Sequence, residues 1–176
     1  MKPTKPVDYG FKRITMANWN ETDDIIQFPS PVRDETWVKA CLKPETNSAV
    51  PKKITAMFEV ARGSMIYGWF FYPLITLAAE QCHRVLEAGA RTRCEQLGLP
   101  TKIPKKKGGL RDAIFSELIK SLAKHGAIFQ RDLPRWGATR HLRNSASHPS
   151  RQTILSPGMA ISCLESSVEL LNQLFK

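Results

Sequence analysis

The sequence predicts an all-α protein in which four main helices and one shorter helix form a bundle. Apolar residues recur at spacings of three and four in four separate windows between residues 51 and 176. No window shows the period-two alternation of β-branched residues that indicates a half-buried strand. The chain of 176 residues has the size of one ordinary domain. We therefore expect a single helical bundle, preceded by an irregular arm.

Residues 1–50 are expected to form that arm and to pack on the bundle of residues 51–176. Scattered prolines and polar residues interrupt the arm without a sustained period. A short helix is predicted around Asp34 to Leu42. Trp19 and Trp37 are expected to pin the arm to the bundle, because large aromatic side chains gain most from burial.

The first two main helices each begin at a proline, a residue that suits the first helical turn. The first follows Pro51, and its predicted apolar stripe consists of Ile54, Phe58, Ala61 and Met65. The second runs from near Pro73 to near Gly98, which is a glycine terminator. Its predicted stripe consists of Leu74, Ala78, Cys82, Val85 and Gly89.

A basic loop and the third main helix are predicted next. Residues 99–109 contain two prolines, the run Lys105, Lys106 and Lys107, and a Gly-Gly pair, all of which interrupt regular structure. The third helix is predicted from Leu110 to Lys124 on its apolar spacing. The last helix is predicted to begin after Ser156, a good N-cap, and to continue to Phe175.

Composition narrows the classes of function. Lys and Arg number 26 against 16 Asp and Glu, and the net charge of +10 favours anionic partners such as nucleic acid. The four cysteines, without a C-x-x-C pair, exclude a zinc scaffold and a disulfide framework. The uncharged stretch 63–79 is too short and interrupted for a bilayer span, so no membrane association is expected. No secretory signal is evident at the start of the sequence, and we expect a cytoplasmic protein.

The most cationic segment, residues 130–151, lies between the last two main helices. It holds five arginines, two histidines and one acid, Asp132. If Asp132 caps a short helix that begins near Pro134, the helical repeat places three residues on one face, with Arg140 beside them. These three residues are Trp136, Thr139 and Arg143.

The run from Arg143 to His148, with Asn144 after the arginine, resembles the R-x4-6-H motif of the HEPN superfamily. The order of parts is also similar, since the motif lies between the third main helix and the last. The resemblance covers residues 51–176 and implies a HEPN-like helical bundle. It further implies a metal-independent endoribonuclease that works as a homodimer, without a cofactor or metal. Arg135 and His141 fit the same spacing, but lack the polar residue that follows Arg143.

The chemistry of RNA transesterification suits these residue types. Arg143 is expected to hold the phosphate as a bidentate cation, and His148 to transfer protons near neutral pH. Asn144 is expected to orient the histidine or donate to phosphate. Further contacts to the RNA backbone, which require charge and reach, are expected from Arg140, Arg151, Ser147, Lys105, Lys106 and Lys107. Ser147 equally suits a role in capping a turn.

The resemblance also implies a biological setting in toxin or phage-defence systems, with an antitoxin or regulatory protein that restrains the activity. In one branch of the family a tyrosine lies two residues past the histidine and is modified by a partner nucleotidyltransferase. Ser150 occupies that position here. This departure argues against that form of regulation.

Three alternatives to the ribonuclease stay open. In the first alternative, the protein is a non-catalytic HEPN-like module that binds RNA, a nucleotide or a partner protein. In a purely structural interpretation, Arg143 pairs with a surface carboxylate, and His148 ends a helix ahead of Pro149. DNA binding by one basic helix ranks last, because no helix-turn-helix spacing is clear.

Other clusters are interpreted as structural. His83, Cys82 and Cys94 lack a convergent fourth ligand, so packing is favoured over a metal or thiol site. Glu80 and Glu87 are expected to solvate a helix face or bind a basic side chain. An aromatic cluster is expected to pack in the core or in a dimer interface, and this interpretation is favoured over stacking on nucleic-acid bases. It consists of Tyr67, Trp69, Phe70, Phe71 and Tyr72.

Overall fold

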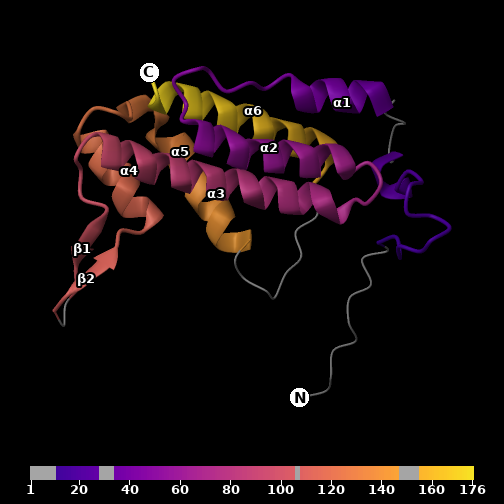
Figure 1. The fold of residues 1–176 in the computed structure, drawn as a ribbon, viewed down its shortest axis with the longest axis horizontal. Helices are drawn as coiled ribbons and strands as arrows, with labels where there is room; N and C mark the ends of the chain where they lie inside the picture. Colours follow the sequence, from indigo (N-terminus) through magenta and orange to yellow (C-terminus); the bar gives the residue numbers. More distant parts are fainter. Residues whose placement is uncertain (1–10, 28–33, 106–107, 147–154) are drawn as a thin grey trace, which may run out of the picture.

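The computed structural model describes residues 11–27, 34–105, 108–146 and 155–176. These residues are mostly helical, as predicted, and they also include one two-stranded sheet (Figure 1). The α-helices are α1 (Asp34–Leu42), α2 (Lys52–Tyr67), α3 (Pro73–Gln96), α4 (Phe115–Lys124), α5 (Leu133–Ala146) and α6 (Pro157–Leu174). The 3-10 helices are η1 (Asp24–Gln27) and η2 (Gln130–Asp132), and the strands are β1 (Lys102–Pro104) and β2 (Leu110–Asp112).

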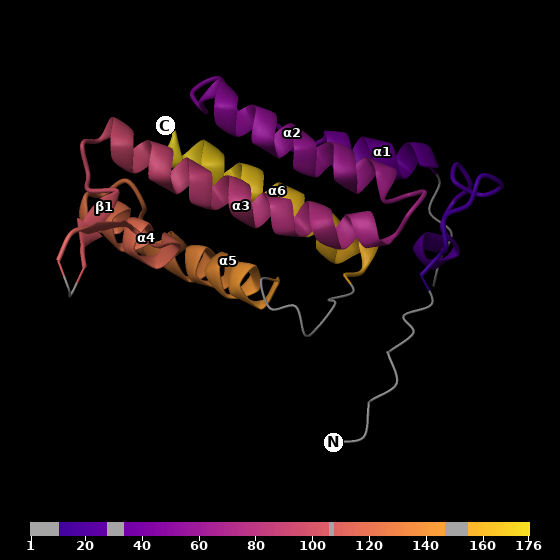
Figure 2. The same ribbon diagram turned by 60° about the horizontal axis from the view of Figure 1, so that its bottom comes forward.

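The longest helix, α3, lies at the centre of the bundle. It contacts α2, α6, α4 and α5. Figure 2 shows α2 on one side of α3 and α4 followed by α5 along another side, with α6 also alongside. The chain reverses from α2 into α3 at Gly68, where a Cβ atom would collide with the Ile75 side chain. Glycine is therefore the residue that this tight reversal accepts.

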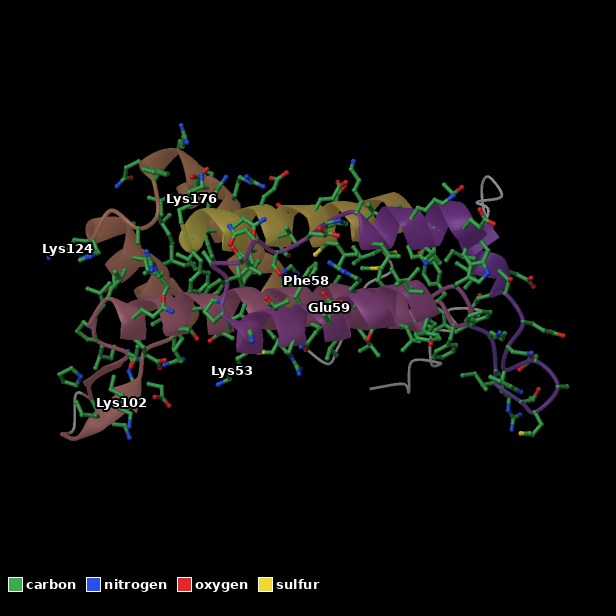
Figure 3. All side chains as sticks on the ribbon, turned by 45° about the horizontal axis from the view of Figure 1, so that its top comes forward. Lys53, Phe58, Glu59, Lys102, Lys124 and Lys176 are labelled. Atoms are coloured by element: carbon green, nitrogen blue, oxygen red, sulfur yellow. The ribbon has the colours of Figure 1, made fainter. Side chains whose placement is uncertain are left out.

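The predicted apolar stripe of α2 is confirmed. Ile54, Phe58, Ala61 and Met65 are the buried residues of this helix, and each is fully enclosed. Figure 3 shows Phe58 inside the bundle and Lys53 extending outward. The helical repeat thus gives α2 one apolar face along its whole length.

The predicted helix α1 is confirmed, and Trp37 anchors it as expected. The indole of Trp37 is only 2% exposed. Its Nε1 donates to the carbonyl oxygens of Met65 and Ile66, at 3.2 and 3.3 Å. The indole therefore fills a site on α2 and satisfies carbonyls at its end.

The prediction that Trp19 pins the arm was wrong, since its side chain is 59% exposed. Trp19 lies in a turn whose hydrogen bonds are local, such as the bond from Thr15 N to Asn18 Oδ1. Buried Asp23 holds this part of the arm instead. Its Oδ2 accepts from the Tyr72 amide at 2.9 Å, and its own amide donates to the Trp69 carbonyl at 2.9 Å.

Residues 99–109 do not form a loop throughout, contrary to the prediction. Strand β1 pairs with β2 in an antiparallel hairpin that matches Lys102 with Asp112. Gly108 and Gly109 have φ values of 87° and 79°. Positive φ is a backbone conformation that favours glycine, so the Gly-Gly pair suits the place where the chain enters β2.

Helix α4 begins at Phe115 rather than at the predicted Leu110, which lies in β2. The Glu117 carboxylate accepts the Ile114 amide at 2.9 Å and both terminal nitrogens of Arg111, at 2.9 and 2.7 Å. A glutamate in the first turn that binds the amide of the N-cap residue fixes the start of a helix. This contact sets the boundary between hairpin and helix.

Helix α6 begins as predicted. Ser156 is its N-cap, and the serine Oγ accepts from the Met159 amide at 3.3 Å. The seam between α6 and α3 is closely packed, because a Cβ atom at Gly89 would lie 2.8 Å from Leu171 Cδ2. Glycine at this position lets the two backbones approach.

The uncharged stretch 63–79 forms the end of α2, a turn and the start of α3. Within it Trp69 and Tyr72 are buried, as the core interpretation of the aromatic cluster expects, whereas Tyr67 is exposed. Among the described helices, none combines the length and the apolar character that crossing a bilayer requires.

Candidate functional site

Helix α5 contains Arg143 and Asn144, the first two residues of the predicted motif, and its start follows the prediction closely. Asp132 ends η2 and is the last residue before α5, with Pro134 in the first turn of the helix. The Asp132 side chain is mostly buried, and its Oδ2 lies 4.0 Å from Arg131 Nε. The cationic segment therefore enters a helix directly after its single acid.

The first half of α5 is anchored by its inner face. The Trp136 ring is 1% exposed and meets the Phe115 ring of α4 edge to face, with centroids 6.1 Å apart. Thr139 is 8% exposed, and its hydroxyl donates to the Arg135 carbonyl at 3.2 Å. By the helical repeat, the backbone position of Arg143 is the next step of this inner stripe. The stripe thus passes from an aromatic residue to a hydroxyl and then to an arginine.

Arg135, the arginine of the rival motif match, is already paired across the bundle. Its Nη2 donates to the Glu169 carboxylate and, at 3.2 Å, to the Ser166 hydroxyl, both on α6. The guanidinium therefore ties α5 to α6. Arg135 is thus engaged by partners within the bundle.

Apart from Lys105, the predicted site residues lie either in α5 or outside the described residues. The backbone of Arg140, Arg143 and Asn144 lies in the last two turns of α5. The residues outside the described part are Ser147, His148, Arg151, Lys106 and Lys107. The structure thus brings the backbone positions of three predicted residues together at one helix end.

The side of α3 that faces α4 and α5 carries the imidazole of His83, a residue interpreted from the sequence only as part of the packing. Thr76, His83 and Ala90 recur every seven residues on this stripe, and Cys94 continues it. The Cys94 thiol lies 3.9 Å from the Leu118 carbonyl of α4, and α5 follows α4 along the same side of α3 (Figure 2). His83 therefore lies on the side along which α5 runs.

His83 is an unusual residue for a helix interior. Its side chain is 6% exposed, and its Nδ1 has no hydrogen-bond partner among the residues that the structure describes. Burial lowers the pKa of the imidazole from 6.5 to about 4, because the charged form loses its hydration. His83 is therefore neutral at pH 7. The spacing of Thr76, His83 and Ala90 was the sequence signal that could have placed it.

Glu80 and Glu87, expected on a solvated or base-binding face, are partly exposed on α3. No three His, Cys, Asp or Glu side chains in the described part of the chain are grouped so as to hold a metal ion. A small cavity lies beside Trp136, lined also by Phe129, Leu170 and Gln173. Arg143 is seven residues further along α5, about 10 Å by the helical rise. The cavity therefore belongs to the far end of the helix.

Lys105 belongs to a different part of the molecule. It is exposed and begins the turn of the β1–β2 hairpin, where its amide donates to Gly109 O at 2.9 Å. Figures 1 and 2 show the hairpin at one end of the bundle, whereas α5 ends alongside the middle of α3. The described lysine of the basic run and the helix of the motif are thus separated.

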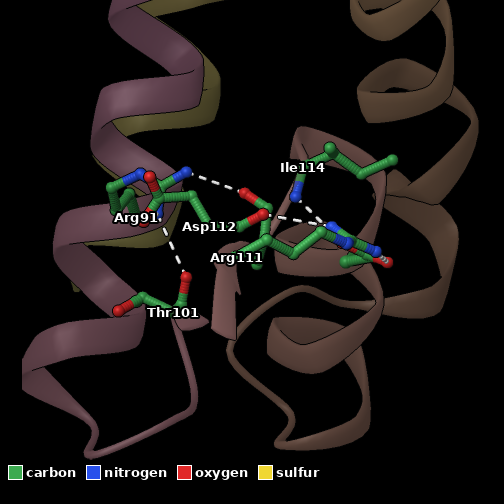
Figure 4. A network of polar contacts seen from close by, with 7 residues as sticks. Arg91, Thr101, Arg111, Asp112 and Ile114 are labelled. Carbon is green, nitrogen blue, oxygen red and sulfur yellow. Dashed lines mark hydrogen bonds and ion pairs between the residues drawn. The ribbon is translucent and has the colours of Figure 1, made fainter. Parts of the chain in front are cut away.

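A single arginine of α3 holds the base of the hairpin (Figure 4). Arg91 donates to the Thr101 carbonyl at 3.3 Å, just before β1, and to the Ala113 carbonyl at 2.7 Å, just after β2. It also lies 3.9 Å from the Asp112 carboxylate. Both strands of the hairpin are therefore attached to the same guanidinium.

Comparison with known proteins gives no relative for this chain: no family model, no curated protein and no solved structure matches it.

Proposed function

We propose that the protein is a metal-independent endoribonuclease of the HEPN-like type, which cleaves RNA at Arg143 and His148. The observation that carries the proposal is the inner stripe of α5. Trp136 and Thr139 are buried, and the next position of the stripe is Arg143. A helix used only for packing has no reason to replace an apolar residue by a permanent cation at this position. The mostly helical fold is compatible with the proposal.

In the proposed reaction the ribose 2′-hydroxyl attacks the adjacent phosphate, and the 5′-oxygen leaves. Arg143 would hold the non-bridging oxygens, because a guanidinium offers two parallel donors to a phosphate. The imidazole of His148 would move a proton at one of the two oxygens. Asn144 would orient the imidazole or donate to the phosphate.

One histidine cannot serve both sides of an in-line displacement at once. We therefore propose that two copies of the chain work together, each contributing its motif. Arg140, Arg151, Ser147 and the lysine run Lys105–Lys107 would contact the RNA backbone, since neutralised phosphates supply much of the affinity for nucleic acid. The net charge of +10 supports this role.

The decisive experiment is cleavage of an end-labelled RNA of mixed sequence in EDTA by the native chain and by His148→Ala. His125→Ala is the matched control, because His125 is an exposed histidine at the end of α4. We expect native and His125→Ala proteins to leave 2′,3′-cyclic phosphate ends, and His148→Ala to leave the RNA intact. Equal cleavage by His148→Ala, or products with 3′-hydroxyl ends, would contradict the proposal.

Absence of cleavage also has a defined meaning. If several RNAs stay intact at protein concentrations that favour dimers, while the chain still binds them, the non-catalytic binding module replaces the ribonuclease. The proposed setting as a toxin or defence effector is tested in bacterial cells. Expression of the native chain is expected to arrest growth, and expression of His148→Ala to permit it.

A further inference from the structure

Two cysteines from distant parts of the sequence meet between α3 and α6. Cys82 of α3 is fully buried, and Cys163 of α6 is partly exposed. The Cys163 sulfur lies 4.0 Å from the Ala79 carbonyl, which is one turn before Cys82 on the same helix. The Cys163 thiol is the largest cause that raises the pKa of Cys82, and the Cys82 thiol is the largest cause that lowers the pKa of Cys163, so the two side chains are neighbours across the seam. Neither sulfur is engaged in a disulfide.

The seam around this pair is built for close approach of the two backbones. Small residues line it on both sides, and each of them is buried. They are Ala79 and Gly89 on α3, and Ala160 and Ser167 on α6. A disulfide requires Cα atoms about 4.4–6.8 Å apart, and small side chains at a contact let two helices approach closely. We therefore expect the seam to accept the bond without large movement of either helix.

The environment makes the two thiols unequal. The neighbouring Cys82 thiol lowers the pKa of Cys163, and so does the Ser167 side chain, whose hydroxyl donates to the Cys163 carbonyl oxygen at 2.7 Å. The same thiol contact and burial raise the pKa of Cys82. Because Cys163 also has access to solvent, it is the sulfur that meets an oxidant first.

We propose that Cys82 and Cys163 form an oxidation site, which a hydroperoxide converts into a disulfide between α3 and α6. The Cys163 thiolate attacks one peroxide oxygen, the O–O bond breaks, and a sulfenic acid forms with release of hydroxide. The Cys82 sulfur then attacks the Cys163 sulfur, and the S–O bond breaks. The oxygen leaves as water with the proton of Cys82. In total, two thiols and one hydrogen peroxide give one disulfide and two waters.

The other two cysteines provide an internal reference. Burial raises the pKa of Cys41 to about 12, and burial also raises the pKa of Cys94, whose thiol donates to the Leu118 carbonyl. A neutral, buried thiol reacts slowly with peroxide. Both are expected to stay reduced while the pair is oxidised.

The test uses the full-length, fully reduced chain. It is treated with hydrogen peroxide, quenched with catalase, denatured in N-ethylmaleimide and weighed by mass spectrometry. We expect a species that has lost two hydrogens and taken up two maleimides instead of the four that the reduced chain takes up. Peptide mapping is expected to join the peptides of Cys82 and Cys163. A four-maleimide product, or a link through other cysteines or between two chains, would overturn the proposal.

Variants separate the two steps. Cys163→Ser is expected to abolish the link, and Cys41→Ser, the matched control, to keep it. Cys82→Ala is expected to stop at the sulfenic acid, which dimedone traps at residue 163. Dimedone at another cysteine would overturn the assigned order. The peptide map of the native chain decides the proposal even where a variant fails to fold.

The disulfide would close a ring of chain that includes α4, α5 and the motif. Because a cross-link restricts the unfolded chain, the oxidised protein is expected to unfold at a higher temperature, and dithiothreitol is expected to reverse the shift. A lower unfolding temperature after oxidation would overturn the claim that the seam accepts the bond without distortion. The proposal is independent of RNA cleavage, so either proposal can fail alone.

Discussion

Helices α2 and α5 both lie against α3, but they use their inner faces differently. The inner face of α2 is apolar from its first turn to its last and is fully enclosed. The inner face of α5 is buried at Trp136 and Thr139 and then reaches the position of Arg143. The contrast teaches that the inner face of α2 is buried along its whole length, whereas α5 is anchored by the inner residues of its first half.

Removing a large side chain from the α2 stripe is the most direct test of whether the inner face of α2 holds the bundle together. Phe58→Ala deletes a fully buried ring, so we expect it to lower the free energy of unfolding by about 3–5 kcal/mol. Val60→Ala, on the exposed face of the same helix, is expected to change it by less than about 0.5 kcal/mol. Urea unfolding measures both. Equal effects would mean that the stripe does not hold the bundle.

The neutral imidazole of His83 makes stability depend on pH. Its pKa is about 4 when folded and about 6.5 when unfolded, so the unfolded chain binds the proton more readily. Stability is therefore expected to fall as pH drops from about 6.5 to about 4, by roughly 3 kcal/mol at the lower end. Unfolding of native and His83→Gln proteins across this range checks it. The variant is expected to lose this part of the slope.

Two of the arginines of α5, Arg143 and Arg135, provide the next comparison. Arg143→Ala is expected to slow RNA cleavage by about 100-fold or more, because a preorganised donor to the reacting phosphate is lost. Arg135→Ala removes a partly exposed ion pair with Glu169 and is expected to cost less than about 1 kcal/mol of stability. Its cleavage rate is expected to match that of the native chain. Loss of cleavage in Arg135→Ala alone would reverse the assignment of the motif.

The smallest effect concerns the start of α6, the helix that follows the motif segment. Ser156→Ala removes the hydroxyl that accepts the Met159 amide and is expected to cost about 1 kcal/mol. Ser156→Asp keeps an acceptor at this position and is the matched control. Helix α2, by contrast, follows Pro51 without a side-chain cap. Thermal unfolding of the two variants measures how much the Ser156 cap contributes to stability.

Much of the helical architecture was predictable, because it depends on residues close together in the sequence. The spacing of Ile54, Phe58, Ala61 and Met65 determines the buried face of α2, and Ser156 marks the start of α6. These signals act within a few turns of one helix. Periodicity therefore identified the helices before their partners were known.

The errors arose where a distant or competing contact decides the structure. The spacing of Leu110 and Ile114 fits a helix, but Glu117 binds the Ile114 amide and leaves Leu110 to a strand. Trp19 was expected to be buried, yet Asp23 anchors the arm through amides near the start of α3. A propensity for burial does not specify which of several residues obtains the available site.

The candidate site was predictable only in part. The sequence places Arg143 in register with Trp136 and Thr139, and the observed burial of these two residues agrees with that register. The pairing of Arg135 was not predictable, because Glu169 lies on another helix. The meeting of Cys82 with Cys163 likewise depends on how α3 and α6 pack.

The attachment of the hairpin to Arg91 has a mechanical consequence. Because one guanidinium binds the carbonyls on both sides of the hairpin, the two strands cannot part at the base while both bonds hold. Arg111 of β2 also binds Glu117 of α4, so the hairpin is attached to two helices of the bundle. With strands of three residues, the far end of the hairpin lies about 10 Å from Arg91. The positive charge of Lys105 is therefore held at the end of a short arm whose direction α3 and α4 determine together.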